Sequence, residues 1–164
     1  MKKLAAMAMI AATPVAAQEP PEPGLEFVFE EIVTLSPAVE VGQTSRGVRR
    51  IIPITGGRFE GPEIRGEVMP GGWDWQLDRP DGCTDVVADY FLKTDDGVVI
   101  NIRNTGSICR AKEGEAPIPV RTHPVFEPPL GKYEWLGKQT FVGTLGMAPE
   151  GEGPAVRIRI YRVK

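Results

Sequence analysis

One hairpin, over residues 83–103, constrains the fold more than any other stretch of this sequence. Its turn, Thr94-Asp95-Asp96-Gly97, suits a type I turn that is closed by a glycine in the left-handed conformation. That loop pairs Thr94 with Val98 and so fixes the register of both strands. In this register one face carries only apolar side chains: Val86, Ala88, Tyr90, Leu92, Ile100 and Ile102. The pattern predicts two antiparallel strands with that face buried.

The same register brings the only two cysteines, Cys83 and Cys109, to opposite positions at the mouth of the hairpin. A disulfide there would stabilise the fold by roughly 3 kcal/mol in the chain-entropy model. The alternatives are two buried free thiols, or a loop after residues 104–106 that shifts the register. We expect the disulfide, because the cysteine count is even and the N-terminal segment indicates an oxidising compartment. The spacing does not resemble the C-x-x-C pattern of a redox-active pair.

Short runs rich in valine, isoleucine and phenylalanine recur along the rest of the chain. The 19 glycines and 16 prolines between and within them disfavour long helices. These runs predict strands over residues 25–35, 48–54, 63–69, 73–77, 120–127, 140–145 and 155–163. Pro124 interrupts one run, so that strand is expected at an edge or at a bulge. About eight or nine strands in sequence order predict an all-β, single-domain antiparallel β-barrel.

The first of these runs, residues 25–35, contains a conflict in its alternation. Leu25, Phe27, Phe29, Val33 and Leu35 share one phase, but Glu31 falls in the same phase. Either a bulge near residues 30–31 resets the alternation, or a carboxylate points into the core. We favour the bulge, because bulges are common in antiparallel strands.

Two glycine pairs, Gly56-Gly57 and Gly71-Gly72, frame a short predicted strand over residues 63–69. Glycine permits backbone angles that a side chain forbids, so each pair is expected to turn the chain sharply. The second pair leads into Trp73-Asp74-Trp75. Alternation on a strand would place the two tryptophans on one face and Asp74 on the other.

The first residues have the order of a secretory signal peptide. Two lysines precede an uncharged apolar run over residues 4–12, and small residues at 15–17 form a cleavage site before Gln18. The apolar run is too short to span a bilayer. We therefore expect a signal peptide over residues 1–17, a proline-rich leader over 18–24 and the domain over 25–164. The mature protein would be periplasmic or secreted, with no membrane association after cleavage.

Charge and motif content exclude several function classes. The net charge is −3 and the basic residues do not form a patch, which disfavours a nucleic-acid partner. No nucleophile elbow, phosphate-binding glycine loop or H-E-x-x-H motif is present. With one histidine and two paired cysteines, a zinc site is not expected, and no acidic loop has the spacing of a calcium site. We expect neither a metal nor a cofactor.

Several motifs, in order, resemble the DUF3237 (UPF0311) family. They are RRIIPITGGRFEGPEIRGEVMPGGWDWQLDRPDG, DYFLKTDDGVVINIRNTG, RTHPVFEP, YEWL and FVGT, and the likeness extends over residues 25–163. The sequence departs from the family pattern at His123, Val125 and Gly137. The resemblance implies a small β-barrel-like domain and supplies no agreed reaction.

Two carboxylates are candidate acid–base groups. Asp74 lies between two tryptophans, where desolvation would raise its pKa, and Glu127 lies near the end of a predicted strand. Each also fits a structural carboxylate that accepts backbone hydrogen bonds at a turn.

Four further residues are candidates for ligand binding. Arg121 could hold an anionic group as a bidentate fork, or be a solvated surface arginine. Trp75, Tyr90 and Trp135 could line a pocket for an apolar or aromatic ligand, or belong to the core.

These residues support three functions. The first is a periplasmic binder of a small apolar or aromatic molecule, held in a barrel pocket. The second is a cofactor-independent isomerase, lyase or cyclase that transfers protons through Asp74 or Glu127. The third is a structural or interaction module that uses a face of the sheet, for example to form a homodimer. We rank the binder slightly above the enzyme. A pocket that holds Asp74 together with Glu127 or Arg121 would favour the enzyme, and a filled barrel would favour the third function.

Overall fold

The structure is a computed structural model that describes residue 19 and residues 21–164. The predicted signal peptide lies outside the described residues. The described leader residues have no regular structure and are exposed. The elements that follow are β1 (Leu25–Leu35), β2 (Val39–Thr44), β3 (Gly47–Glu60), β4 (Arg65–Val68), β5 (Gly72–Asp78), β6 (Cys83–Thr94), β7 (Val99–Cys109), β8 (Arg121–Glu127), the 3-10 helix η1 (Glu134–Lys138), β9 (Phe141–Met147) and β10 (Ala155–Val163).

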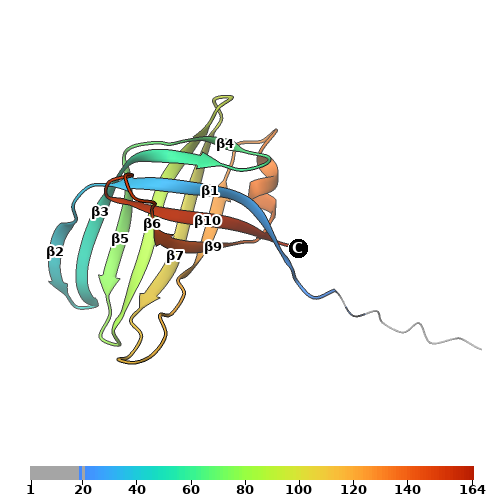
Figure 1. The fold of residues 1–164 in the computed structure, drawn as a ribbon. Helices are drawn as coiled ribbons and strands as arrows, with labels where there is room; N and C mark the ends of the chain where they lie inside the picture. Colours follow the sequence, from blue (N-terminus) through green and yellow to red (C-terminus); the bar gives the residue numbers. More distant parts are fainter. Residues whose placement is uncertain (1–18, 20) are drawn as a thin grey trace, which may run out of the picture.

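The strands form one antiparallel sheet that closes on itself through β1 (Figure 1). One edge of β1 pairs with β10, and its other edge pairs with the second half of β3. From β10 the sheet continues through β9, β8, β7 and β6, and β4 and β5 share the position between β6 and β3. The result is a closed eight-stranded antiparallel barrel with two extra strands, which confirms the predicted fold class.

The hairpin that fixed the prediction is formed in the predicted register. Thr94 and Val98 close the turn with an N–H···O bond of 2.9 Å, and Gly97 has a φ of +87°. Pairing runs without a shift from Lys93 opposite Val99 to Cys83 opposite Cys109. The two cysteines are joined by a disulfide, as predicted.

Two features of the N-terminal half differ from the prediction. No strand was predicted over residues 39–44, which form β2 and pair with the first half of β3, and only residues 45 and 46 form the turn between the two strands. The glycine pair Gly56-Gly57 does not turn the chain; it lies inside β3, with φ of +140° at both residues. A Cβ on Gly57 would lie 2.0 Å from the carbonyl oxygen of Ile32. These glycines therefore let β3 bend and pass close to β1.

The preferred interpretation of Glu31 is wrong. The bulge lies three residues earlier, because the pairing with β10 shifts between Phe27 and Phe29. That shift turns Phe27 outward, where its ring packs on Tyr161, and keeps Phe29 inside. Glu31 then points into the barrel in phase with Phe29 and is 0% exposed. The alternative, a carboxylate in the core, is the correct one.

Pro124 fits its strand without a bulge. β8 pairs with β7 over residues 122–127 without a register shift, whereas β9 pairs with β8 only at Arg121 and Thr122. Pro124 thus lies where β8 has no partner in β9, which matches the expected edge position.

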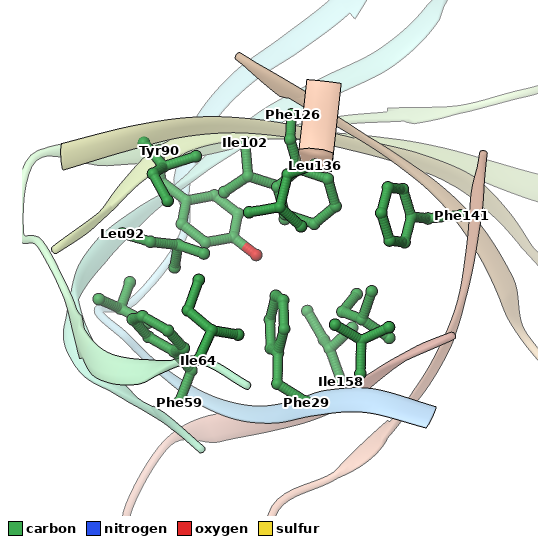
Figure 2. Close-up of a cluster of buried hydrophobic side chains, with 14 of the residues drawn as sticks. Phe29, Phe59, Ile64, Tyr90, Leu92, Ile102, Phe126, Leu136, Phe141 and Ile158 are labelled. Carbon is green, nitrogen blue, oxygen red and sulfur yellow. The ribbon is translucent and has the colours of Figure 1, made fainter. Parts of the chain in front are cut away.

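Large aromatic side chains fill one part of the barrel interior (Figure 2). Phe29 contacts Phe59 and Phe126, with ring centroids 5.4 and 6.0 Å apart, and Phe126 packs edge-on against Phe141 at 5.0 Å. The helix η1 contributes Leu136 to this cluster. Fully burying each such side chain stabilises the fold by about 1.5–3 kcal/mol, so this part of the barrel is the core.

The disulfide leads to a stability prediction. In the variant Cys83→Ser/Cys109→Ser, we expect the free energy of unfolding to fall by about 3 kcal/mol, because the cross-link spans 26 residues of the unfolded chain. Urea unfolding of both proteins, with and without reductant, measures this. Reductant should lower the unfolding free energy of the parent protein and leave that of the double variant unchanged. An unfolding free energy of the parent protein that does not change with reductant would contradict the prediction.

Candidate functional site

Beyond the aromatic core, the barrel interior holds a cavity of about 200 Å³. Its wall is mostly aliphatic, from strands on all sides of the barrel. The lining residues are Val33, Leu35, Ile52, Ile54, Asp74, Gln76, Val86, Ala88, Tyr90, Asn104, Ile108, Thr122, Leu145, Val156 and Ile158.

Small residues in two inward-facing rows explain why this space is open. In one row Ala88 separates Asp74 on β5 from Asn104 on β7. In the next row Thr122 on β8 lies between Gly106 and Gly143 of the neighbouring strands. A Cβ on Gly143 would lie 2.2 Å from the Thr122 hydroxyl oxygen. The Thr122 side chain thus covers Gly143, and the small side chains of Ala88 and Thr122 leave unfilled volume where the core has aromatic rings.

A chain of hydrogen bonds holds Asp74 from the side of β3. Arg50 pairs with Asp78, and its Nη1 donates to Gln76 Oε1 over 3.2 Å. Gln76 Nε2 in turn donates to Asp74 Oδ2 over 2.7 Å. Arg50 therefore sets the direction of the Gln76 amide and, through it, the orientation of the Asp74 carboxyl.

Three residues that line the cavity each have a buried side-chain oxygen atom without a hydrogen-bond partner. These atoms are Asp74 Oδ1, Asn104 Oδ1 and the hydroxyl oxygen of Thr122. An unpaired buried polar atom costs about 1–3 kcal/mol, and such atoms are rare in folded proteins. Partners supplied by a bound molecule would remove that cost.

Burial raises the pKa of Asp74 above its ordinary value, and hydrogen bonds from Gln76 and from the backbone N–H of Val87 act in the opposite direction. A carboxyl in this setting exchanges its proton closer to neutral pH than an exposed aspartate does. Asp74 is the one acid on the cavity wall that has a free oxygen.

A buried hydrogen bond between a tyrosine and a glutamate crosses the barrel. Tyr90, from β6, donates its hydroxyl proton to Glu31 Oε1, from β1, over 2.6 Å. The Tyr90 hydroxyl points into the barrel interior (Figure 2). Burial raises the pKa of Glu31 to about 7, while the hydrogen bond from Tyr90 lowers it, and Oε2 of Glu31 has no partner. Burial also raises the pKa of Tyr90.

Of the residues singled out in the sequence, Asp74 and Tyr90 line the cavity. Trp75 is in the opposite phase to Asp74, as predicted, and so points outward with 46% exposure. Asp74 therefore lies on the inner face of β5, and the tryptophans lie on the outer face.

The other three candidates lie elsewhere. Glu127 is exposed and borders a shallow surface groove with Asp89, Phe91 and Asn101. The exposed Arg121 donates to the carbonyl of its neighbour Val120. Trp135, in η1, packs on Phe141 in the core region. The structure does not bring Glu127 or Arg121 together with Asp74.

Four residues that contribute to this interior were not singled out as site residues from the sequence: Gln76, Asn104, Thr122 and Glu31. The hairpin register contained the signal for Asn104, since it places this residue opposite Ala88 on the apolar face. Alternation along β5 contained the signal for Gln76, since it places this residue on the same face as Asp74. For Thr122 the inward direction depends on the neighbouring strands.

Among residues 19 and 21–164, no group of three or more histidine, cysteine, aspartate or glutamate side chains is placed to hold a metal ion. Within the same residues, no helix is long and apolar enough to cross a membrane.

The fold and the cavity define a small antiparallel β-barrel protein with an apolar interior site and a few polar groups. The chain belongs to the DUF3237 family, whose model is described as a protein of unknown function and matches residues 23–163. The resemblance seen in the sequence motifs is thereby confirmed.

Individual relatives agree with this assignment. A UPF0311 protein of Rhodopseudomonas palustris is 37% identical over 130 residues, which are 73% of this chain and 85% of the relative. The crystal structure of a β-barrel-like protein from Acinetobacter baumannii matches with a TM-score of 0.78 and 34% identity, over 89% of this chain and 99% of that one.

One relative carries a named activity. A hydroalkoxylation enzyme of Penicillium herquei is 32% identical over 141 residues, which are 86% of both chains. The crystal structure of an enzyme from the same fungus matches with a TM-score of 0.66 and 28% identity, over 90% of this chain and 99% of that one.

The buried Glu31 leads to a prediction about pH. Its pKa is raised from 4.5 to about 7 in the folded state. The folded protein therefore binds a proton more tightly than the unfolded chain, and Glu31 contributes stability that is complete below pH 4.5 and is lost as the pH rises through 7. The loss amounts to about 3 kcal/mol.

The variant Glu31→Gln removes this titration. We expect it to lack the decline in unfolding free energy between pH 5 and about 8 that the parent protein shows. Urea unfolding across this pH range measures the effect, and Glu60→Gln, an exposed carboxylate on β3, is the matched control. A decline of equal size in the Glu31→Gln variant would contradict the assignment.

Proposed function

We propose that this protein binds a small, largely apolar or aromatic molecule inside the barrel. The observation that carries the proposal is the cavity of about 200 Å³, whose aliphatic wall includes three buried oxygen atoms without partners. Pockets for small molecules combine apolar walls with a few placed polar groups in this way.

The volume limits the size of the ligand. An apolar cavity of roughly 150 Å³ is enough to bind benzene. A cavity of about 200 Å³ therefore suits a compound with one or two rings. The same cavity argues against a purely structural role, for which a filled barrel would be expected.

We place this binding in the periplasm or outside the cell. The proposal is supported by the basic, apolar and small-residue order of residues 1–17, and the disulfide between Cys83 and Cys109 fits an oxidising compartment.

A second function, proton-transfer catalysis without a cofactor, is favoured by the free oxygen of Asp74 and by the Penicillium relative. Hydroalkoxylation adds the O–H of an alcohol across a C=C bond, with no net oxidation. One carboxyl can serve both halves of such a reaction. Asp74 as the acid would give its proton to one alkene carbon, the alcohol oxygen would bond to the other, and the alcohol proton would return to Asp74. Glu127 lies outside the cavity and takes no part in this proposal.

The binding proposal is tested by filling the cavity. We expect a panel of one- and two-ring aromatic compounds to include members that raise Tm by about 4 °C at ten times their Kd. The variant Ala88→Leu, which adds bulk between Asp74 and Asn104, should abolish these shifts, whereas Val87→Leu on the outer face should retain them. Unchanged shifts in Ala88→Leu would place the binding site elsewhere.

The catalytic proposal is tested on any compound that the protein converts. The variant Asp74→Asn should lower kcat by about 100-fold or more, because the amide cannot exchange the proton. Glu127→Gln is the matched control and should retain its rate. Full turnover by the Asp74→Asn variant would exclude Asp74 as the acid–base group.

A further inference from the structure

The unpartnered oxygen atoms of the cavity share one chemical property. Asp74 Oδ1 and Asn104 Oδ1 both accept hydrogen bonds, and neither has a donor. They lie in the same inward-facing row, with Ala88 between them. Their backbones are two strand spacings apart, or roughly 10 Å, and both side chains line the space in front of Ala88.

The protein has no donor left for Asp74 in this row. Gln76 lies beside it, but its amide nitrogen already donates to Oδ2 and its amide oxygen already accepts from Arg50. Rotation of the Gln76 amide would break both bonds. A hydroxyl group of the ligand can therefore supply the donor that Asp74 Oδ1 lacks.

The charges of the lining residues further limit the class of ligand that the cavity can bind. None of the lining residues, all of which the structure describes, is a lysine, arginine or histidine. Arg50, on the neighbouring stretch of β3, is paired with Asp78 and Glu40. An organic anion in the cavity would lose its hydration beside Asp74 without gaining a cationic partner, which is strongly unfavourable.

We infer that the cavity selects a neutral aromatic molecule with two hydroxyl groups, one donating to Asp74 Oδ1 and the other to Asn104 Oδ1. This inference rests on the proposed binding function and names its ligand class. The Thr122 hydroxyl, which can donate as well as accept, meets any further polar group on the ligand. The aliphatic wall holds the ring system.

Four naphthalene compounds of one size test the inference with the full chain: naphthalene, 2-naphthol, 2,7-dihydroxynaphthalene and 2-naphthoate. Each satisfied acceptor should tighten binding about 3- to 10-fold, which corresponds to a typical net hydrogen bond. We expect Kd to fall from naphthalene to 2-naphthol and again to the dihydroxy compound. The naphthoate should bind at least tenfold more weakly than 2-naphthol.

A variant tests the assignment of Asn104 as the second acceptor. Asn104→Leu, which replaces the amide by an apolar group of similar size, should remove the advantage of the dihydroxy compound over 2-naphthol. Asn101→Leu, a substitution of the same type on the outer face of β7, should preserve that advantage. Circular dichroism of each variant confirms that the barrel is formed.

The outcomes separate this inference from the proposed function. If none of the four compounds binds, the proposed binding function itself fails. If naphthalene binds as tightly as its hydroxylated relatives, or the naphthoate binds most tightly, the cavity is a ligand site but the inferred ligand class is wrong. If Asn104→Leu preserves the advantage of the second hydroxyl, Asn104 is not the acceptor.

Discussion

Closure of the sheet through β1 is the constraint on which the rest of this structure depends. β1 pairs with β10 along one edge and with β3 along the other. One face of the sheet therefore becomes the inside of the barrel and the other face becomes the outside. The bulge between Phe27 and Phe29 and the close approach at Gly57 make this double pairing geometrically feasible. Without closure, the inward rows of β5 and β7 would face solvent, and Asp74 would be an ordinary surface carboxylate.

Once the barrel is closed, the size of each inward side chain decides what its interior does. Where the inward rows carry Phe29, Phe126 and Phe141, the rings interlock and exclude solvent. Where they carry Ala88 and Thr122, volume remains unfilled. Tyr90 and Glu31 meet across the barrel, with Tyr90 a member of both the core cluster and the cavity wall. The same fold thus supplies a packed core and, beside it, a cavity whose wall contains polar side chains with oxygen atoms that lack hydrogen-bond partners.

The polar side chains of the interior also belong together electrostatically. Asp74 and Glu31 both have raised pKa values because burial disfavours their charged forms, and each retains one oxygen without a partner. Burying two such acids costs free energy, so the stability of the core does not explain their position inside the barrel. Buried acids with free oxygens are instead typical of sites that bind polar groups or exchange protons.

Local patterns in the sequence determined most of the strands, the hairpin register, the disulfide and the opposite phases of Asp74 and Trp75. These features depend on period-two alternation and on turn geometry, which act between near neighbours. Only the tertiary structure decided that Asp74 shares a cavity with Asn104 and Thr122 while Glu127 and Arg121 lie outside it. It also decided that Glu31 is buried against Tyr90. Those outcomes depend on a bulge at Val28, on which strands become neighbours and on how the sheet closes. Contacts between residues far apart in the chain set all three, and no local pattern encodes such contacts.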